Sequence, residues 1–568
     1  MNRKKFLKNS LSAIAGVWSG MWTPPSLWAG GKAPAIIHKR RPNILFILMD
    51  QERSWADLPA GLDLPQRRNF AETALSFNQY HVNAIACGPS RSVIYTGQHI
   101  QKTRVFDNPG MAPGRQDLDP VLTPTIGNLL KTQGYHTAYI GKWHLHKFGA
   151  KERDNLCFAL KPFGFEEYIP PIPEGDTDGA AWEGAMHDAA VARRSAEWFK
   201  RQTSTDGDKP WYLAVNLINP HDIRHFNATG TQADTLHPHF ASDLAGLPAA
   251  DLYQTDLGYG LPESFPGADK RPVDAHRLFV EDAAYFFGSI PREDTAAWQR
   301  YQNYYFNCLR DVDRHIGTIL DSLEKSGQSE NTIVVFTSDH GEMAGAHGLR
   351  GKGPFLYKEN FRVPLLIRHP DLAAGGNTDR LACSLDLVPT LLSAAGMDED
   401  ARRSQYPALK GYDLLAGMSD RSGPRDATVF MSNIVHCCNP VNKKYIIDTL
   451  YARDRGEKVD PFRFPEDFIT FGNRSFMRGV FDGRYKFGRY FRPDQHHVPE
   501  NWETLVKYND LELYDTAKDL QEMNNIAGEP GNKELILRLN QKLNSLLEDE
   551  AGKDLGAFMP GAPERWRL

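Results

Sequence analysis

Four apolar segments of the chain each run straight into a cluster of polar side chains. They are "NILFILMD" (43–50), "HTAYIG" followed by Lys142 (136–142), "PWYLAVNLINPH" (210–221) and "NTIVVFTSDHGE" (331–342). Continuous apolar runs separated by helical stretches are typical of strands buried on both faces of a parallel sheet. Ligands bind at the carboxyl ends of such strands. We therefore expect the four polar clusters to converge on one crevice.

The length of the chain, 568 residues, predicts more than one folding unit. A polar stretch before Gly423 predicts a boundary between a catalytic domain at 41–423 and a small C-terminal subdomain at 424–568. In the second unit, Asp482-Gly483 between apolar runs predicts a hairpin, and leucines at helical spacing predict a helix over 532–550. Two stretches, 160–178 and 222–296, have little periodicity and are expected to carry substrate selectivity.

The first thirty residues are expected to direct export rather than to fold. A basic start, "MNRKKFLKN", precedes an apolar run that is too short to span a bilayer. The pattern resembles a twin-arginine signal with lysine at the second arginine, so the ordinary secretory route stays open. A periplasmic or secreted protein without a stable membrane span is the prediction; a disordered N-terminus or a retained anchor is the alternative. A net charge of -5 argues against broad nucleic-acid binding.

The segment "CGPSR" at 87–91 places a single thiol next to a predicted helix start. Pro89 suits the first turn of a helix, so Cys87 is expected beside exposed backbone N–H groups that can bind an anion. Arg91 lies one turn further on, within reach of the same anion. The alternative interpretation is an ordinary free cysteine before a helix.

Cys-x-Pro-Ser-Arg resembles the signature of the sulfatase family. The motifs "MDQ", "GKWHL", "NPH" and "SDHGEMAGAHGLRGKGPF" occur in that family's order, and the similarity spans the chain from about residue 41 into the C-terminal segments "GRYKFGRYF" and "ELYDTAKDLQEMNN". The resemblance implies the alkaline phosphatase superfamily fold, an α/β architecture with a large mixed sheet flanked by helices and a smaller C-terminal α+β subdomain. It also implies that a maturation enzyme oxidises Cys87 to formylglycine (3-oxoalanine). One hydroxyl of its hydrate would attack sulfur and the other would expel sulfate.

The resemblance implies a divalent metal held by Asp50, Gln51, Asp339, His340 and the modified Cys87. The "MDQ" and "DH" pairs are more similar to choline-sulfatase and phosphonate-monoesterase relatives than to the arylsulfatases. Oxygen ligands favour Ca²⁺, our first choice, or Mg²⁺, whereas a histidine makes Mn²⁺ more competitive. Taken alone, Asp50 could instead be a helix cap or turn former.

Four further residues are expected to act on the sulfate ester. Lys142 and His144 are two apart in a segment expected to be extended, so they would point to the same side and hold sulfate oxygens; an ordinary solvated loop is the alternative. By resemblance, His221 and Lys352 contact the sulfate and the bridging oxygen. One of them should protonate or stabilise the departing alcohol.

The predicted function is a formylglycine-dependent sulfatase acting on a sulfate ester, with a sulfated carbohydrate as the expected substrate. Its partners would be that glycan and the maturation enzyme. The nearest alternative is hydrolysis of phosphonate or phosphate esters by the same site. Two others are a non-catalytic glycan-binding homologue with unmodified Cys87, and a metal-dependent phosphatase that uses the unmodified thiol.

Overall fold

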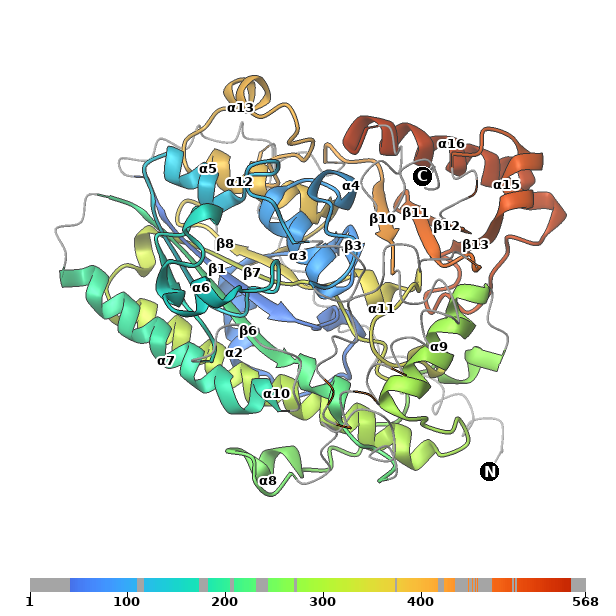
Figure 1. Cartoon of the computed structure of the whole chain (residues 1–568), viewed down its shortest axis with the longest axis horizontal. Coiled ribbons are helices and arrows are strands. Elements are labelled where there is room, and N and C mark those ends of the chain that lie inside the picture. The colour runs from blue at the N-terminus through green and yellow to red at the C-terminus, as the bar shows by residue number, and fades with distance from the viewer. Residues whose placement is uncertain are drawn as a thin grey trace, which may run out of the picture.

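An eight-stranded sheet lies at the centre of the larger part of the molecule (Figure 1). From one edge to the other its strands are β5 (Glu167–Ile169), β4 (His136–Gly141), β6 (Trp211–Pro220), β1 (Asn43–Asp50), β7 (Thr332–Ser338), β8 (Leu365–Arg368), β2 (Leu75–His81) and β9 (Asn377–Cys383). The structure is a computed structural model. It describes residues 41–552 apart from 110–116, 173–181, 205–208, 231–243, 270–272, 373–374, 417–422, most of 435–471, 493–494 and 496–497. The predicted export signal at 1–30 lies outside the described residues.

The four predicted apolar strands lie side by side at the centre of this sheet. β1 pairs in parallel with β6 and with β7, and β6 pairs in parallel with β4. Every residue of β1 and β7 is buried, which explains why their sequences are continuously apolar instead of alternating. β8 runs antiparallel to β7. The sheet is therefore mixed, and the predicted fold class is confirmed.

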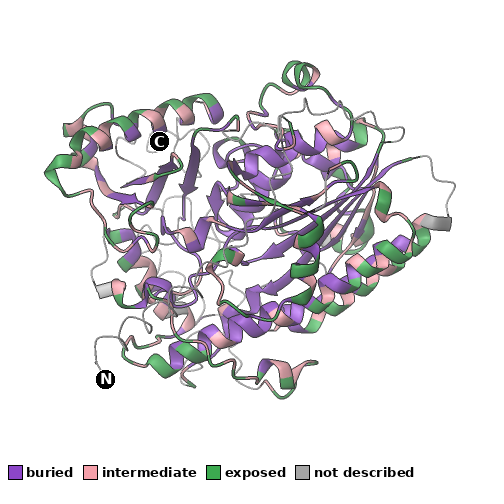
Figure 2. Ribbon diagram, turned by 180° about the vertical axis from the view of Figure 1, so that it is seen from behind, coloured by how far each residue is buried: buried purple, intermediate pink, exposed green. Residues whose placement is uncertain are grey.

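Helices cover both faces of the sheet (Figure 1). One face packs against α2 (Pro65–Thr73), α7 (Glu183–Ser204) and α10 (Thr295–Lys325). The other packs against α3 (Cys87–Thr96), α5 (Ile126–Thr132) and α12 (Leu387–Ala394). The other helices of this part are α4 (Ile100–Thr103), α6 (Ala150–Arg153), α8 (Ala250–Tyr253), α9 (Asp274–Phe287), α11 (Lys358–Phe361) and α13 (Glu399–Gln405). Figure 2 shows the strands buried, whereas the outer faces of α7 and α10 are exposed.

A second sheet of five strands lies beside the first (Figure 1). Its order is β13 (Asn509–Asp515), β12 (Tyr485–Phe491), β11 (Phe476–Phe481), β10 (Thr428–Ser432) and β3 (Ala84–Ile85). Two helices accompany it, α15 (Trp502–Tyr508) and α16 (Lys533–Glu550). The predicted hairpin and the predicted C-terminal helix are both present. Gly483 has a φ of 90°, the left-handed conformation that this turn needs from glycine, and α16 buries Leu539, Leu543 and Leu547.

The strand β3 connects the two parts of the molecule. Ala84 and Ile85 pair in parallel with Met431 and Ser432 of β10, although they precede Cys87 by only a few residues in the sequence. The second sheet thus includes a strand from the N-terminal part of the chain. The predicted boundary near Gly423 stays a prediction.

No helix in the described part of the chain is long and apolar enough to cross a lipid bilayer.

Candidate active site

The carboxyl ends of β1 and β7 place the predicted acidic residues next to each other. β1 ends at Asp50, and Met49 is paired in register with Ser338 at the end of β7. Asp339 and His340 follow directly, and the backbone N–H of Asp339 donates to the carbonyl of Met49 over 3.1 Å. The parallel pairing of two strands therefore brings together residues almost 290 positions apart.

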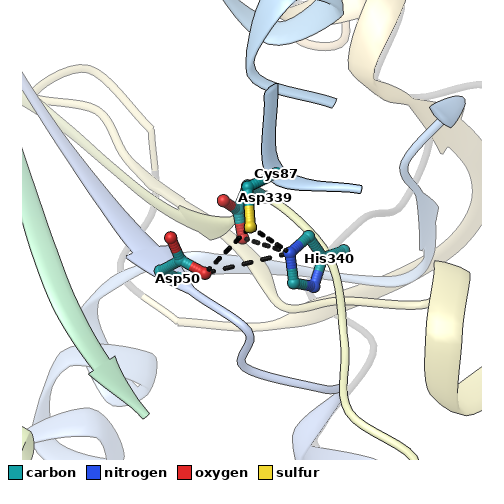
Figure 3. A group of neighbouring side chains, drawn as sticks. All are labelled: Asp50, Cys87, Asp339 and His340. Atoms are coloured by element: carbon teal, nitrogen blue, oxygen red, sulfur yellow. Dashed lines mark hydrogen bonds and ion pairs between the residues drawn. The ribbon is translucent and has the colours of Figure 1, made fainter. Parts of the chain in front are cut away.

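Cys87 joins this cluster from the first residue of α3 (Figure 3). Its Sγ lies 3.1 Å from Nε2 of His340 and 3.6 Å from Oδ1 of Asp50. One ligand atom from each of Asp50, Cys87, Asp339 and His340 lies within 4.8 Å of the others, and all four side chains are buried. Two carboxylates and an imidazole around one point are a donor set that suits a divalent cation. The residues present fit the predicted metal site.

Arg91 holds the two carboxylates in place. Its Nε donates to Oδ2 of Asp339 over 2.8 Å and its Nη2 to Oδ2 of Asp50 over 3.3 Å. Its Nη1 donates to Oδ1 of Asn216 in β6 over 3.1 Å and to the carbonyl of Lys142 over 3.0 Å. The guanidinium is fully buried and its donors point to protein acceptors. Contact between Arg91 and a bound oxyanion stays a prediction, whereas its contacts with the two carboxylates are in the structure.

The start of α3 differs from the expected anion-binding position. The helix begins at Cys87, not at Pro89. The N–H of Gly88 donates to Oδ1 of Asn108 over 2.9 Å, and the N–H of Ser90 donates to the carbonyl of Ala86 over 3.0 Å. These two N–H groups are therefore not exposed, whereas anion binding at Cys87 stays a prediction.

Gln51 lies beside the cluster with its side chain already hydrogen-bonded. It has a φ of 75°, its Nε2 donates to Glu342, and its Oε1 accepts from Nζ of Lys352. Glu342 also accepts the N–H of Ala344 over 2.9 Å and that of Gly351 over 2.7 Å. Glu342 thus fixes the loop that carries Lys352 next to Gln51. The role of Gln51 as a metal ligand stays a prediction.

Lys142 contacts the cluster directly, and His144 follows in an unexpected conformation. Nζ of Lys142 lies 2.7 Å from Oδ2 of Asp50. His144 has a φ of 57°, so the segment is not extended and the expected geometry was wrong. Burial, followed by the charge of Lys142, holds the pKa of His144 well below its ordinary value. The two side chains still share one electrostatic environment.

His221 is the first residue of a 3₁₀ turn, His221–His225, which directly follows β6. Two buried carboxylates secure this corner. Asp188 of α7 accepts the N–H of Ile218 over 2.7 Å and that of Asn219 over 2.8 Å. Asp222 accepts the N–H groups of Gly184 and Ala185, at the start of α7, over 2.9 and 2.8 Å. These hydrogen bonds therefore fix the turn that carries His221 relative to α7.

The charges in the cluster favour ionised acids and a neutral His221. Burial opposes ionisation of Asp50, but the positive charges of Lys142 and Arg91 outweigh it and hold the pKa of Asp50 well below its ordinary value. Burial and Asp50 oppose ionisation of Cys87, but Lys352 and His340 lower the pKa of the thiol. Burial, then Lys142 and Lys352, hold the pKa of His221 well below its ordinary value. The centre can thus accept negative charge from a ligand.

Sequence reasoning missed Asn216, Glu342, Asp188 and Asn108. Asn216 stands in an otherwise apolar strand, "WYLAVNLINP", and a buried polar residue in such a run is a signal that could have been used. Glu342 stands in the quoted "SDHGE" motif, two residues after His340. Asp188 and Asn108 lie in segments whose sequence carries no comparable signal.

Comparisons with known proteins agree with this geometry. A model of the sulfatase family matches residues 42–397. The chain is 28% identical over 411 residues to an N-acetylglucosamine-6-O-sulfatase of Bacteroides thetaiotaomicron, covering 63% of this chain and 68% of the relative. It is 26% identical over 439 residues to a choline-sulfatase of Rhizobium meliloti, covering 72% and 75%. The solved phosphonate monoester hydrolase of Silicibacter pomeroyi has a similar fold, with a TM-score of 0.61 and 20% identity over 90% of this chain and 97% of that one.

Proposed function

This chain belongs to the sulfatase family, and we propose that it releases sulfate from a carbohydrate sulfate ester by means of a formylglycine at position 87 and a divalent cation. The family match confirms the resemblance predicted from the motifs, and the chain is a sulfuric ester hydrolase. The observation that carries the proposal is the position of Cys87, whose Sγ lies 3.1 Å from His340 and 3.6 Å from Asp50 inside one buried cluster.

Asp50, Asp339 and His340 would hold the cation, with Gln51 and residue 87 completing its ligands. Ca²⁺ is our first choice, with Mg²⁺ and Mn²⁺ as alternatives. A bound cation would lower the pKa of a hydroxyl on the hydrated formylglycine and neutralise sulfate oxygens. Arg91 orients the two carboxylates, because one guanidinium donates to both. Nζ of Lys142 lies 2.7 Å from Oδ2 of Asp50 and helps to hold that oxygen in place.

Lys142, His144, His221 and Lys352 would bind the sulfate ester next to the cation. The buried Nζ atoms of Lys142 and Lys352 supply donors for sulfate oxygens. Because the pKa of His221 is well below its ordinary value, its imidazole is neutral at pH 7 and donates a hydrogen bond from one nitrogen. His221 or Lys352 would protonate or stabilise the departing alcohol.

A carbohydrate substrate is favoured by the similarity to an N-acetylglucosamine-6-O-sulfatase. We expect the segments 160–178 and 222–296 to contribute to the recognition of the sugar. We further propose that the protein is exported by its basic and apolar N-terminus, and that Cys87 is oxidised by a formylglycine-generating maturation enzyme. The similarity in fold to a phosphonate monoester hydrolase keeps phosphonate esters as the second candidate substrate class.

Intact mass of the peptide that contains residue 87, isolated from the native host, tests the proposed nucleophile. Exchange of the thiol and one hydrogen for an aldehyde oxygen lowers the mass by about 18 Da. Finding only the unmodified thiol, together with no turnover of any ester, would support a glycan-binding protein instead. If Cys87→Ser kept substantial activity, a phosphatase that uses the unmodified cysteine would be favoured.

The substrate class is tested by the release of sulfate from a panel of sulfated mono- and oligosaccharides. A parallel assay compares kcat/KM for 4-nitrophenyl sulfate and 4-nitrophenyl phenylphosphonate. We expect the sulfate to be preferred. A higher kcat/KM for the phosphonate would overturn the assignment to sulfate esters while leaving the site itself intact.

A further inference from the structure

Arg224 stands three residues after His221, in the same 3₁₀ turn. Its guanidinium carbon lies 4.8 Å from the centre of the Phe287 ring, at the last residue of α9. Among the described residues, Arg224 makes no ion pair and its side chain donates no hydrogen bond. An arginine beside a reaction centre that has no acceptor among the described residues is unusual, because a guanidinium carries five N–H donors.

The Phe287 end of α9 is tied to the other side of the candidate site. Arg350 donates to the carbonyl of Phe287 over 3.3 Å, to that of Ala283 over 3.0 Å and to that of Gly288. Arg350 stands two residues before Lys352. Arg224 and Phe287 therefore meet between the turn that carries His221 and the loop that carries Lys352.

Arg224 differs in exposure from the residues expected to hold the reacting sulfate. Lys142 and His221 are each 2% exposed and Lys352 is 8% exposed, whereas Arg224 is half-buried. Burial lowers the pKa of Arg224, and the negative charges of Cys87, Asp50, Asp107 and Glu183 act against that shift. Arg224 is thus close enough to the candidate site to interact electrostatically with its acidic groups, without a direct contact.

The geometry points to Arg224 as the binding site for a second anionic group of the substrate, a carboxylate or a further sulfate next to the ester that is cleaved. This inference rests on the proposed sulfatase function. A planar guanidinium held over an aromatic ring presents paired N–H donors to two oxygens of one anion. Such a contact selects sugars that carry at least two negative charges over esters that carry only the reacting sulfate.

Binding to the Cys87→Ala variant, which cannot turn over the ester, tests the inference by calorimetry. The probes are N-acetyl-D-glucosamine-6-sulfate, with one anion, D-glucosamine-2-N,6-O-disulfate, with a second sulfate, and a 6-O-sulfated glucosamine linked to a uronic acid, with a carboxylate. We expect Arg224→Met to weaken binding of the doubly charged probes about 10- to 100-fold, the range for a hydrogen bond between charged groups. The singly charged probe should lose less than about threefold. The doubly charged probe whose binding is weakened by Arg224→Met shows whether the second anion is a sulfate or a carboxylate.

Methionine keeps an unbranched stem against Phe287, so the substitution removes the charge with little loss of packing. Arg224→Lys keeps the charge and should lose less than Arg224→Met on the same probes. Arg277→Met is the matched control, because Arg277 is exposed on α9, the helix that ends at Phe287, and pairs with Glu281 over 2.7 Å. This control substitution should leave the affinity for the singly charged and for the doubly charged probes unchanged.

Equal losses for singly and doubly charged probes, or no loss for either, would overturn the inference. The thermal midpoint of each variant shows whether a uniform loss comes from misfolding, and Arg224→Lys then decides between charge and fold. If the mature wild-type protein released sulfate from no ester, the proposed function would fail. The binding comparison on the Cys87→Ala background would still decide the role of Arg224.

Discussion

Nε of Arg91 donates to Oδ2 of Asp339 over 2.8 Å, and both side chains are fully buried. This contact joins α3, which begins with Cys87, to the end of β7, which carries two of the predicted metal ligands. The same guanidinium reaches Asp50 and Asn216. The nucleophile position and the metal ligands are therefore set relative to each other by one side chain.

Replacement of Arg91 by lysine should impair the reaction more than a loss of charge alone would suggest. A single Nζ cannot donate to Asp339, Asp50 and Asn216 at the same time. We expect kcat/KM for sulfate release and the affinity of the metal-free protein for its cation each to fall about 10- to 100-fold. Titration calorimetry and steady-state kinetics measure the two effects. Arg68→Lys, at an exposed position on α2, should change neither; unchanged values in Arg91→Lys would contradict this role.

Removal of the metal should abolish activity without unfolding the protein. Lys142 and Arg91 remain as partners for the acidic side chains when the cation is absent, so the folded state keeps compensated charges. Dialysis against EDTA followed by thermal denaturation and sulfate release measures both effects. Adding back Ca²⁺, Mg²⁺ and Mn²⁺ one at a time, with elemental analysis of the native protein, identifies the ion. Full activity of the metal-free protein would refute the proposed site.

Substitution of Asp188 by asparagine should displace His221. The amide of asparagine would put N–H donors against the N–H of Ile218 or Asn219, which now donate to Asp188. We expect a loss of about 1–3 kcal/mol in the free energy of unfolding, and a fall in kcat with a smaller change in KM. Urea denaturation and kinetics measure these. Arg193→Gln, exposed on the same helix, is the control. Lower stability with an unchanged kcat would show that Asp188 has no part in positioning His221.

The charge of Glu550 should stabilise the fold at neutral pH and lose that effect in acid. Burial raises the pKa of Glu550, but the hydrogen bond with His99 at 2.8 Å and the ion pair with Arg425 at 2.9 Å lower it to about 2, against an ordinary value of 4.5. The unfolded chain therefore binds this proton more readily than the folded one. The stabilisation is complete above pH 4.5 and is lost as the pH falls toward 2.

Glu550→Gln should accordingly lower the free energy of unfolding by about 3 kcal/mol at pH 7. The difference from the wild type should narrow between pH 5 and pH 3. Chemical denaturation at several pH values measures it, with Glu548→Gln, at an exposed position on the same helix, as the control. A difference that does not vary with pH would contradict the assignment to this ionisation.

The strands and most of the residues gathered at their ends could be predicted because their signals are local. The apolar run of β1 predicts a buried strand without knowledge of its partners, and the end of that run predicts the position of Asp50. The partners of Arg91 could not be read in this way. Its guanidinium bonds residues 248, 125 and 41 positions away, and no local pattern encodes which of several acceptors a long side chain reaches.

The errors have physical causes of the same kind. The segment 142–144 is not extended because His144 adopts a left-handed conformation, which sequence spacing does not reveal in a residue other than glycine. The stretch 222–296 contains α9, which buries part of its surface against residues around Phe355. The strand β3 has two residues, too few for any period to be recognised.

The pairing of β3 with β10 has a consequence for how the protein is made. Nδ2 of Asn83 donates to the carbonyl of Val429 across 346 positions of sequence. At about 5–20 residues per second, a ribosome needs roughly 20 to 70 s to reach the second partner after the first has been synthesised. During that interval the thiol of Cys87, four positions beyond Asn83, lacks the contacts that bury it in the folded protein. We therefore expect this side chain to be accessible in the nascent chain before the fold is complete.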